Sequence, residues 1–268
     1  MQIMVSEMVK KICNAEVIKN ESLTSDDKVK KMTLLVPEIS MSVKPGQFIN
    51  LKLADSCYPL LRRPFCIAGA DKQDGTITII YRVVGQGTEI MSVAKQGDSF
   101  NLLGPLGNGF TPNSKKPLLI GGGMGLAPLL FLANQFESNG ISSTILIGGK
   151  NKDEVFWDKL YCNCRDICIT TDDGSVGERG FVTDTLGKLL DSQEYKNIDG
   201  VYACGPEIML KKIASICKDK QIPCQVSLEN YMACGLGACL SCTIETTSGK
   251  RLKVCSDGPV FDSTEVVW

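Results

Sequence analysis

Apolar and polar positions follow two different patterns along the chain, and the pattern changes at about residue 113. Before that point, short segments rich in Val, Ile and Thr alternate or run apolar, and turn sequences containing Gly and Pro separate them. The predicted strands are Met4–Val17, Val29–Val36, Gln47–Leu53, Thr76–Val84 and Asp98–Leu103, with another short strand opening at Leu61. Strands at this spacing favour a small closed barrel, because closure removes exposed sheet edges.

From residue 113 onward, strand-like and helix-like segments alternate. The predicted strands are Pro117–Gly121, Ile141–Gly148, Ile167–Thr170, Gly200–Ala203 and Pro223–Leu228. The predicted helices are Leu126–Ser138, Val155–Cys162, Val182–Leu190 and Glu207–Lys220. This alternation predicts a mainly parallel sheet with right-handed crossovers, and such sheets bind ligands at the carboxyl ends of their strands.

Four cysteines near the end of the chain have the spacing C-x4-C-x2-C…C: Cys234, Cys239, Cys242 and Cys255. This is the spacing of plant-type [2Fe–2S] clusters. Gly235 and Gly237 allow the loop to fold back, and they leave room for backbone N–H groups to reach the cluster sulfurs. The alternatives are a structural zinc site or buried core cysteines, but zinc sites favour paired C-x2-C knuckles. A Rieske cluster is excluded, because it needs two histidines and the chain has none.

Composition narrows the class of protein and its compartment. A chain of 268 residues with a net charge of −1 is long enough for two domains or more and gives no reason to expect nucleic acid or an anionic membrane as partner. The 13 cysteines are odd in number, and Met1 to Cys13 has no apolar core of signal-peptide length, so a reducing cytoplasm is expected. Because the chain has no histidine, catalysis by a Ser–His–Asp triad or a Cys–His pair is excluded, whereas redox chemistry carried by cofactors remains possible.

Two sequence features of the N-terminal half are not required to fold a barrel and suit the binding of an anion. Arg62 and Arg63 open a short strand, and an arginine fork suits a phosphate, although an ordinary solvated charge pair is the simpler reading. Gly85 and Gly87 precede a helix that begins at about Thr88, which is typical of an anion site. The alternative is a hairpin turn with an N-cap threonine.

A glycine-rich turn follows the first strand of the second half, at Gly121 to Pro128. Its glycines would let a pyrophosphate reach backbone N–H groups, but it does not match the usual dinucleotide fingerprint in either frame. Cys204-Gly205-Pro206 stands at the equivalent place after a later strand. The simpler interpretation there is a buried cysteine followed by a helix that proline opens.

These segments together resemble the ferredoxin–NADP reductase superfamily. The motif R-x-[YF]-[ST] corresponds to Arg63–Cys66, with cysteine where a hydroxyl residue is usual. G-G-x-G-x-x-P matches Gly122–Pro128, and C-G-P matches Cys204–Pro206. The cluster loop and the tail Val254–Phe261 narrow the resemblance to the electron-transfer subunits of NAD-dependent (class 1B) dihydroorotate dehydrogenases. The resemblance implies an FAD-binding β-barrel domain at 1–112, a parallel-sheet α/β domain binding NAD at 113–222, and a small [2Fe–2S] domain at 223–268.

The resemblance also implies roles for individual residues and no catalytic acid or base in this chain. Arg63 would pair with the FAD pyrophosphate, and the isoalloxazine would be lined by Pro64, Phe65 and Cys66. The remaining flavin contacts would be Ile80, Tyr81 and Arg82 for the ribityl and adenylate portion, with Gly87 and Thr88 at the phosphates. The implied NAD contacts are Gly122, Gly123 and Gly125, with Cys204 facing the nicotinamide. Cys66 departs from the Ser or Thr of the family, and a thiol is a poor hydrogen-bond donor.

The nicotinamide and the partner are further expectations. Asp172 and Asp173 after the third strand would repel a 2′-phosphate, which favours NAD over NADP. The implied partner is the FMN-containing catalytic subunit that oxidises dihydroorotate to orotate in de novo pyrimidine (UMP) biosynthesis, in a heterotetramer with two of each subunit. Electrons would run from dihydroorotate to FMN, the cluster, FAD and NAD⁺.

Other readings remain open. The chain could serve a related sulfide-linked hydrogenase or a ferredoxin–NADP transhydrogenase, or it could be a non-enzymatic module with structural zinc. Cys162, Cys164 and Cys168 are close enough in sequence to hold another metal. Their alternation more simply indicates one face of an extended segment, because no fourth ligand is evident nearby.

Overall fold

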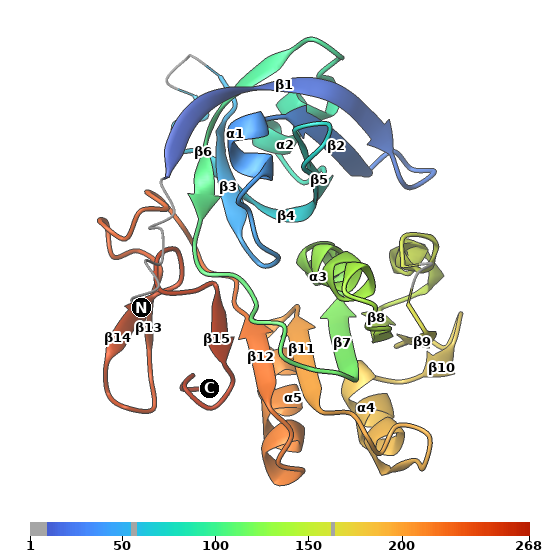
Figure 1. Cartoon of the computed structure of the whole chain (residues 1–268). Coiled ribbons are helices and arrows are strands. Elements are labelled where there is room, and N and C mark those ends of the chain that lie inside the picture. The colour runs from blue at the N-terminus through green and yellow to red at the C-terminus, as the bar shows by residue number, and fades with distance from the viewer. Residues whose placement is uncertain (1–9, 55–57, 162–163) are drawn as a thin grey trace.

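The computed structural model describes residues 10–54, 58–161 and 164–268. Figure 1 shows a barrel above, a sheet flanked by helices below, and the C-terminal segment beside both. A barrel followed by a parallel-sheet domain and a C-terminal appendage is the predicted fold class, and the structure confirms the barrel and the parallel sheet.

Six antiparallel strands close the barrel in the order β1-β2-β5-β4-β3-β6. They are β1 (Lys11–Ser22), β2 (Val29–Leu35), β3 (Phe48–Lys52), β4 (Arg63–Asp71), β5 (Thr76–Arg82) and β6 (Ser99–Leu106). Two short helices accompany them, α1 (Pro37–Ser40) and α2 (Gln86–Ser92). The predicted first strand, Met4–Val17, lies partly outside the described residues, and β1 continues past Val17 to Ser22. Alternate side chains fill the barrel, as the period-2 pattern requires.

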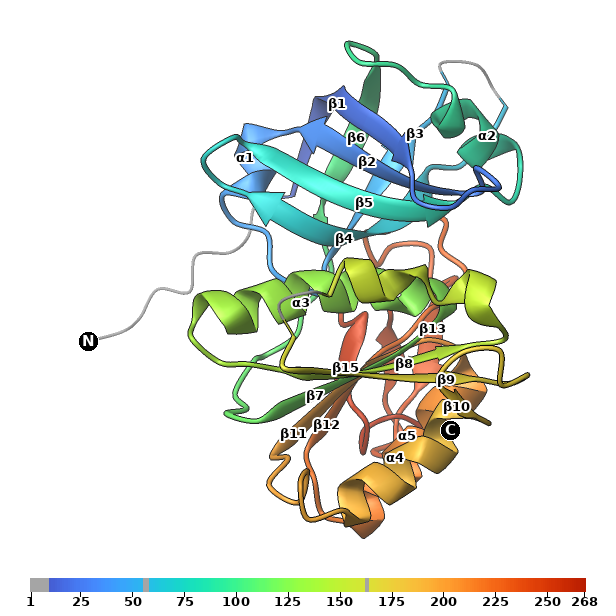
Figure 2. The same cartoon turned by 90° about the vertical axis from the view of Figure 1, so that its right-hand side faces the viewer.

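The second sheet has seven strands in the order β10-β9-β8-β7-β11-β12-β15. They are β7 (Pro117–Gly122), β8 (Thr144–Gly149), β9 (Asp166–Thr171), β10 (Glu178–Arg179), β11 (Gly200–Cys204), β12 (Cys224–Ser227) and β15 (Val260–Asp262). All neighbours are parallel except β12 and β15. The helices α3 (Leu126–Ser138), α4 (Val182–Asp191) and α5 (Glu207–Asp219) cover it. Figure 2 shows α3 between the barrel and the sheet, with α4 and α5 on the opposite face.

Short 3₁₀ turns replace one predicted helix. The segment expected as helix Val155–Cys162 forms η3 (Phe156–Lys159), preceded by η2 (Lys152–Glu154), while η1 (Gly123–Gly125) leads into α3. Trp157 and Tyr161 are buried, so the apolar spacing that predicted a helix reflects inward packing of a tighter turn. Cys162 lies outside the described residues.

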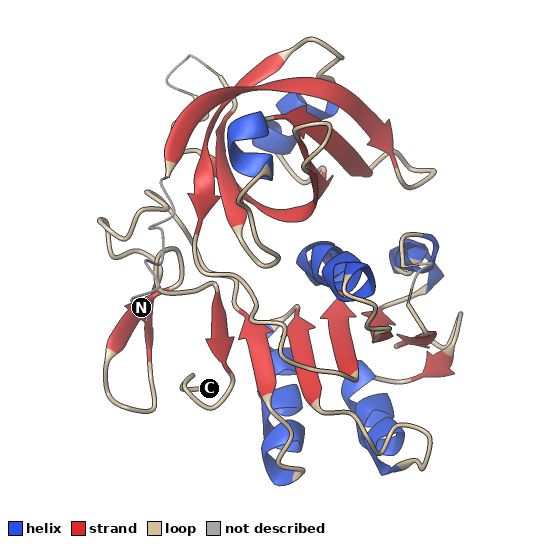
Figure 3. Cartoon of the chain, in the orientation of Figure 1, coloured by secondary structure: helices blue, strands red, loops and turns tan. Residues whose placement is uncertain are grey.

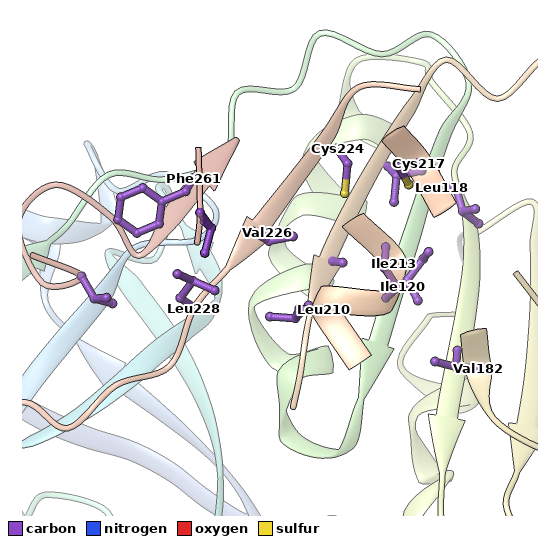
Figure 4. Close-up of a cluster of buried hydrophobic side chains, with 14 of the residues drawn as sticks. Leu118, Ile120, Val182, Leu210, Ile213, Cys217, Cys224, Val226, Leu228 and Phe261 are labelled. Atoms are coloured by element: carbon purple, nitrogen blue, oxygen red, sulfur yellow. The ribbon is translucent and has the colours of Figure 1, made fainter. Parts of the chain in front are cut away.

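A continuous apolar core joins the sheet to the C-terminal segment. Figure 4 shows Leu210 and Ile213 of α5 facing the sheet residue Val226, and the same layer continuing to Leu228 and Phe261. Because Phe261 belongs to β15, which pairs with β12, the chain returns to the sheet after it has built the hairpin β13 (Thr243–Glu245) and β14 (Arg251–Lys253). This return fixes the four-cysteine segment against the body of the molecule.

Within the described ranges 10–54, 58–161 and 164–268, no helix combines the length and the apolar character needed to cross a membrane.

Candidate cluster and nucleotide sites

The cysteine-rich loop is an irregular segment beside the barrel, drawn in tan between β12 and β13 in Figure 3. Cys234, Cys239 and Cys242 lie on this loop, and Cys255 follows β14. Gly235 and Gly237 have φ angles of +69° and +81°, which side-chain-bearing residues rarely adopt. These two glycines allow the loop to turn back on itself.

Backbone N–H groups point at the cysteine sulfurs. Leu236 and Cys239 donate from their N–H groups to Sγ of Cys234 at 3.3 and 3.4 Å. Gly237 donates to Sγ of Cys255 at 3.2 Å, and Cys255 donates to Sγ of Cys242 at 3.4 Å. Donors of this kind stabilise thiolates and tune an iron–sulfur cluster. The loop is therefore built to hold negatively charged sulfur.

The four thiols form two interacting pairs. Burial raises the pKa of Cys234, but hydrogen bonds from the N–H of Leu236 and Cys239 and contact with the Cys239 thiol outweigh it and lower that pKa to about 6. Burial and the neighbouring Cys242 thiol raise the pKa of Cys255 to about 12. Among the described residues, no three His, Cys, Asp or Glu side chains gather around one point. The C-x4-C-x2-C…C spacing of these thiols is that of a two-iron cluster rather than that of a zinc site.

The two pairs differ in exposure. Cys242 and Cys255 are 2% and 0% exposed, whereas Cys239 lies at the surface. Leu236 and Leu240, which flank Cys239, expose 45% and 64% of their surface. The side of the loop with Cys242 and Cys255 thus faces the protein interior, whereas the side with Cys239 is exposed to solvent beside two apolar side chains.

The two arginines at the start of β4 have separate surroundings. Arg62 donates from Nη1 to the backbone oxygens of Asn101 and Asn50 at 2.8 and 3.3 Å, so it braces β6 against β3. Arg63 turns the other way: a Cβ built on Gly87 would lie 3.3 Å from its Nε. Of the pair, Arg63 is the arginine placed beside Gly87, which lies in the first turn of α2, because the helix begins at Gln86, two residues before the predicted start at Thr88.

That turn is held by its own threonine. Oγ1 of Thr88 accepts from the N–H groups of Val84 and Gly85 at 2.9 and 3.2 Å and donates to the oxygen of Gly85 at 2.9 Å. Gly87 is buried, and a Cβ there would meet a methyl carbon of Leu53 at 2.9 Å. The turn therefore requires glycine at this position and brings its backbone close to Arg63.

The other predicted flavin residues line β4 and β5. Pro64 is exposed, and the ring of Phe65 packs edge-on against Tyr81 with centroids 5.9 Å apart. Ile80 and Tyr81 are buried, and the Tyr81 hydroxyl donates to Oδ1 of Asn20 at 3.1 Å. Arg82 is half-buried at the end of β5, where it faces the second sheet.

A cavity of about 560 Å³ opens at the carboxyl ends of β7, β8 and β9, and a cavity of this size suits a nucleotide. Gly122 and Gly123 line it together with Arg82 of the barrel and Asp172 after β9. Asp173 instead accepts the N–H of Ser175 at 2.9 Å. The exposed side chain of Phe181 also lines this cavity, and sequence reasoning did not single it out.

Gly125 and Cys204 meet behind this cavity. A Cβ on Gly125 would lie 2.5 Å from the backbone oxygen of Cys204, so only glycine permits this approach. Cys204 is 1% exposed at the end of β11.

Three titratable groups from distant segments gather where the barrel meets the sheet. Burial, followed by the charge of Glu229, raises the pKa of Cys66 to about 12. Burial, then Cys66 and Glu229, raise the pKa of Cys204 well above its usual value, and burial raises the pKa of Glu229 itself. The two thiols therefore favour their neutral forms, and the pKa of the Glu229 carboxyl lies above that of a free glutamate. Sequence reasoning missed Glu229, because only the fold brings it to the two cysteines.

The residues present fit both implied cofactors. Nitrogen donors converge on the cluster sulfurs, and Gly87 together with Arg63 forms a cradle that a Cβ would fill. The second cysteine group is different: Cys164 Sγ lies 3.4 Å from Oγ of Ser143, Cys168 hydrogen-bonds Tyr195, and Cys162 lies outside the described residues.

Comparison with known proteins agrees with this geometry. Residues 229–267 match the iron–sulfur cluster binding domain of dihydroorotate dehydrogenase B, and residues 14–110 match an oxidoreductase FAD-binding domain. The electron transfer subunit of dihydroorotate dehydrogenase B (NAD(+)) from Desulforamulus reducens is 38% identical over 87% of this chain and 90% of its own length. The corresponding subunit from Fusobacterium nucleatum is 40% identical over 83% of this chain and 86% of its own length.

Solved structures give the same picture. An NADH-dependent reduced ferredoxin–NADP oxidoreductase matches with a TM-score of 0.83 and 31% identity over 95% of this chain and 90% of its own. A ferredoxin NADP⁺ reductase from Neisseria gonorrhoeae, solved with bound FAD and NADP, matches with a TM-score of 0.63 and 18% identity over 78% of this chain and 91% of its own. At that identity the second match supports the fold alone.

Proposed function

The chain belongs to the family of electron transfer subunits of dihydroorotate dehydrogenase B (NAD(+)), and from this membership we propose that it carries electrons between a catalytic partner subunit and NAD⁺. It is an oxidoreductase subunit with an FAD-binding domain and an iron–sulfur binding domain. The observation that carries the proposal is the four-cysteine loop with backbone donors on its sulfurs, seated against the FAD barrel. Dihydroorotate oxidation connects this role to pyrimidine biosynthesis.

When bound, FAD exchanges a hydride with a nicotinamide and single electrons with a [2Fe–2S] cluster, so it connects two-electron to one-electron chemistry. Arg63 and the Gly87–Thr88 turn would hold its phosphates, and the Pro64–Cys66 segment would line its ring system. The contact between Arg63 and Gly87 supports this assignment. Arg82 would reach the adenylate portion from the end of β5.

The nicotinamide nucleotide would occupy the cavity at the strand ends. Gly122 and Gly123 line that cavity, and Gly125 would hold the turn in place through its close approach to Cys204. Asp172 lines the cavity too, and its carboxylate would oppose a 2′-phosphate, which supports NAD. Cys66 and Cys204, whose thiols burial keeps neutral, would form an uncharged wall where the hydride moves.

The partner would be an FMN-containing catalytic subunit, two of each subunit forming the assembly in the cytoplasm. The exposed side of the cluster loop is the docking surface that we assign, because electrons must cross it near Cys239. Leu236 and Leu240 supply the apolar contact that such an interface uses, at 45% and 64% exposure.

A second candidate within the same class is an electron transfer subunit of a ferredoxin–NADP transhydrogenase. The observation that favours it is the match to the NADH-dependent reduced ferredoxin–NADP oxidoreductase over 95% of this chain.

The test mixes the purified chain with the FMN-containing catalytic subunit and follows dihydroorotate-dependent reduction of NAD⁺. The double variant L236D/L240D should lose the coupled activity and co-elution with the catalytic subunit, while its flavin and iron contents stay at wild-type values. The matched control is Met41→Asp, because Met41 is 60% exposed at the end of α1 on the barrel. Coupled reduction with a ferredoxin and NADP(H) in place of the dihydroorotate subunit would favour the second candidate.

A further inference from the structure

Asn50 is a polar residue among buried apolar neighbours in its strand. It lies in β3 within the sequence Phe48-Ile49-Asn50-Leu51, and it is 1% exposed. Neither the oxygen nor the nitrogen of its carboxamide has a hydrogen-bond partner among the described residues. Burying an amide without a partner costs free energy, so proteins satisfy nearly all such groups. The chain thus keeps an amide where an apolar residue would be more stable, unless a bound group satisfies it.

The amide faces the cluster loop. A Cβ built on Gly235 would lie only 2.2 Å from Nδ2 of Asn50, so the glycine backbone packs directly on the carboxamide. Gly235 follows Cys234, whose sulfur already accepts backbone N–H groups from Leu236 and Cys239 at 3.3 and 3.4 Å. Asn50 therefore approaches the same end of the loop from the barrel side.

Asn50 also lies next to the flavin segment. In the β3–β4 ladder it stands opposite Pro64, whose side chain offers no hydrogen-bond partner. Its backbone oxygen accepts from Nη1 of Arg62 at 3.3 Å, and Arg62 in turn holds Asn101 of β6. This brace fixes the strand, and with it the amide, between the flavin segment and the cluster loop.

We propose that the Asn50 side-chain amide is a hydrogen-bond donor to the sulfur atoms of the [2Fe–2S] group held by the loop. The proposal rests on the cluster assignment made above and goes beyond it, because it gives a residue of the barrel domain a direct part in setting the reduction potential of the cluster. Sulfur in such a cluster carries negative charge, and an amide NH₂ offers two donors. A donor to these sulfurs stabilises the reduced, more negative cluster and so raises its reduction potential. Gly235 is glycine because a side chain would separate the amide from the loop.

The test is a redox titration of the purified holo-subunit, with the cluster followed by EPR and the flavin by absorbance. Asn50→Leu keeps the approximate volume and removes the donor, and Asn50→Asp keeps the shape and replaces the donor with negative charge. In both variants we expect the equilibrium constant for one-electron reduction of the cluster to fall about tenfold, a potential lower by about 59 mV. The flavin potential should stay at the wild-type value. Asn101→Leu is the matched control, because its side-chain amide is already engaged with Arg62 in the neighbouring strand.

Each outcome decides the proposal. A full cluster with an unchanged potential in N50L and N50D overturns it, and a shift of the flavin potential alone overturns it in favour of a flavin contact. If N50L takes up no cluster, the decision falls to pulsed EPR on reduced protein labelled with ¹⁵N in the asparagine side chains. A coupling present in the wild type and absent in N50D supports the proposal, and no coupling in the wild type overturns it. A wild-type protein that binds no cluster would instead refute the cluster assignment itself.

Discussion

Replacing Gly235 with alanine tests whether the cluster loop depends on close packing against the barrel. Gly235 has a φ angle of +69°, and an alanine Cβ there would lie 2.2 Å from Nδ2 of Asn50 and 3.2 Å from a methyl carbon of Leu106. The left-handed conformation costs a residue with a side chain about 1–2 kcal/mol. Forcing a methyl group into a filled site costs about 1–3 kcal/mol more. We therefore expect G235A to lose about 2–5 kcal/mol of unfolding free energy and part of its iron.

The control isolates the packing contribution. Gly249 lies in the same C-terminal segment with a φ angle of +76°, but a Cβ on it would meet nothing within 4 Å. G249A should therefore lose only the conformational part, about 1–2 kcal/mol, and keep its iron. The assay is urea unfolding together with iron analysis. In a double-mutant cycle of G235A and N50A, the double variant should regain much of the unfolding free energy that G235A loses through packing. Equal losses in G235A and G249A would refute the close approach of Gly235 to Asn50.

Three further predictions concern the flavin, the carboxyl group of Glu229 and the nucleotide. Arg63→Ala should weaken FAD binding by about 1.5–3 kcal/mol, which is about 10- to 150-fold in Kd, measured as the flavin-to-protein ratio after gel filtration. Arg62→Ala should instead lower the stability of the barrel without selective loss of flavin. Equal flavin loss in both variants would contradict the separate roles of the two arginines. Burial raises the folded-state pKa of Glu229, so protonation contributes stability at low pH that is lost as the pH rises through that pKa. Glu229→Gln should accordingly gain stability relative to the wild type in thermal unfolding as the pH rises above the ordinary pKa of a glutamate, about 4.3, and a stability difference that does not change with pH would contradict the raised pKa. Asp172→Ser should raise kcat/KM for NADPH relative to NADH by about 5- to 10-fold, about 1–1.4 kcal/mol, and an unchanged ratio would exclude the carboxylate as a determinant.

Local patterns were sufficient where the signals for an element lie within its own segment. The predicted helix Leu126–Ser138 has the bounds of α3, because its apolar spacing and its glycine-rich start act within the segment itself. The predicted helix Val155–Cys162 was wrong, because Trp157 and Tyr161 bury themselves through a short 3₁₀ turn whose spacing resembles that of a helix. β15 has three residues and depends on pairing with β12 far along the chain, so nothing local predicted it.

The site residues, too, divide into those that local sequence predicts and those that only the fold brings together. The cysteine spacing alone predicted the cluster loop, since ligand spacing is a local property. Glu229 reaches Cys66 and Cys204 only through the packing of the barrel on the sheet, and no local signal predicts that. Asn50 did have a signal: it is the one polar residue of the run Phe48-Ile49-Asn50-Leu51 in β3, and all four of these residues are buried.

The most direct test of the whole account is the visible absorption spectrum of the anaerobically purified protein, recorded before and after addition of NADH. We expect flavin bands and a broad iron–sulfur shoulder, both bleached by NADH, because hydride transferred to FAD passes on as single electrons to the cluster. A colourless protein that stays inert to NADH after reconstitution with FAD, iron and sulfide would contradict it and return the four cysteines to a structural zinc site.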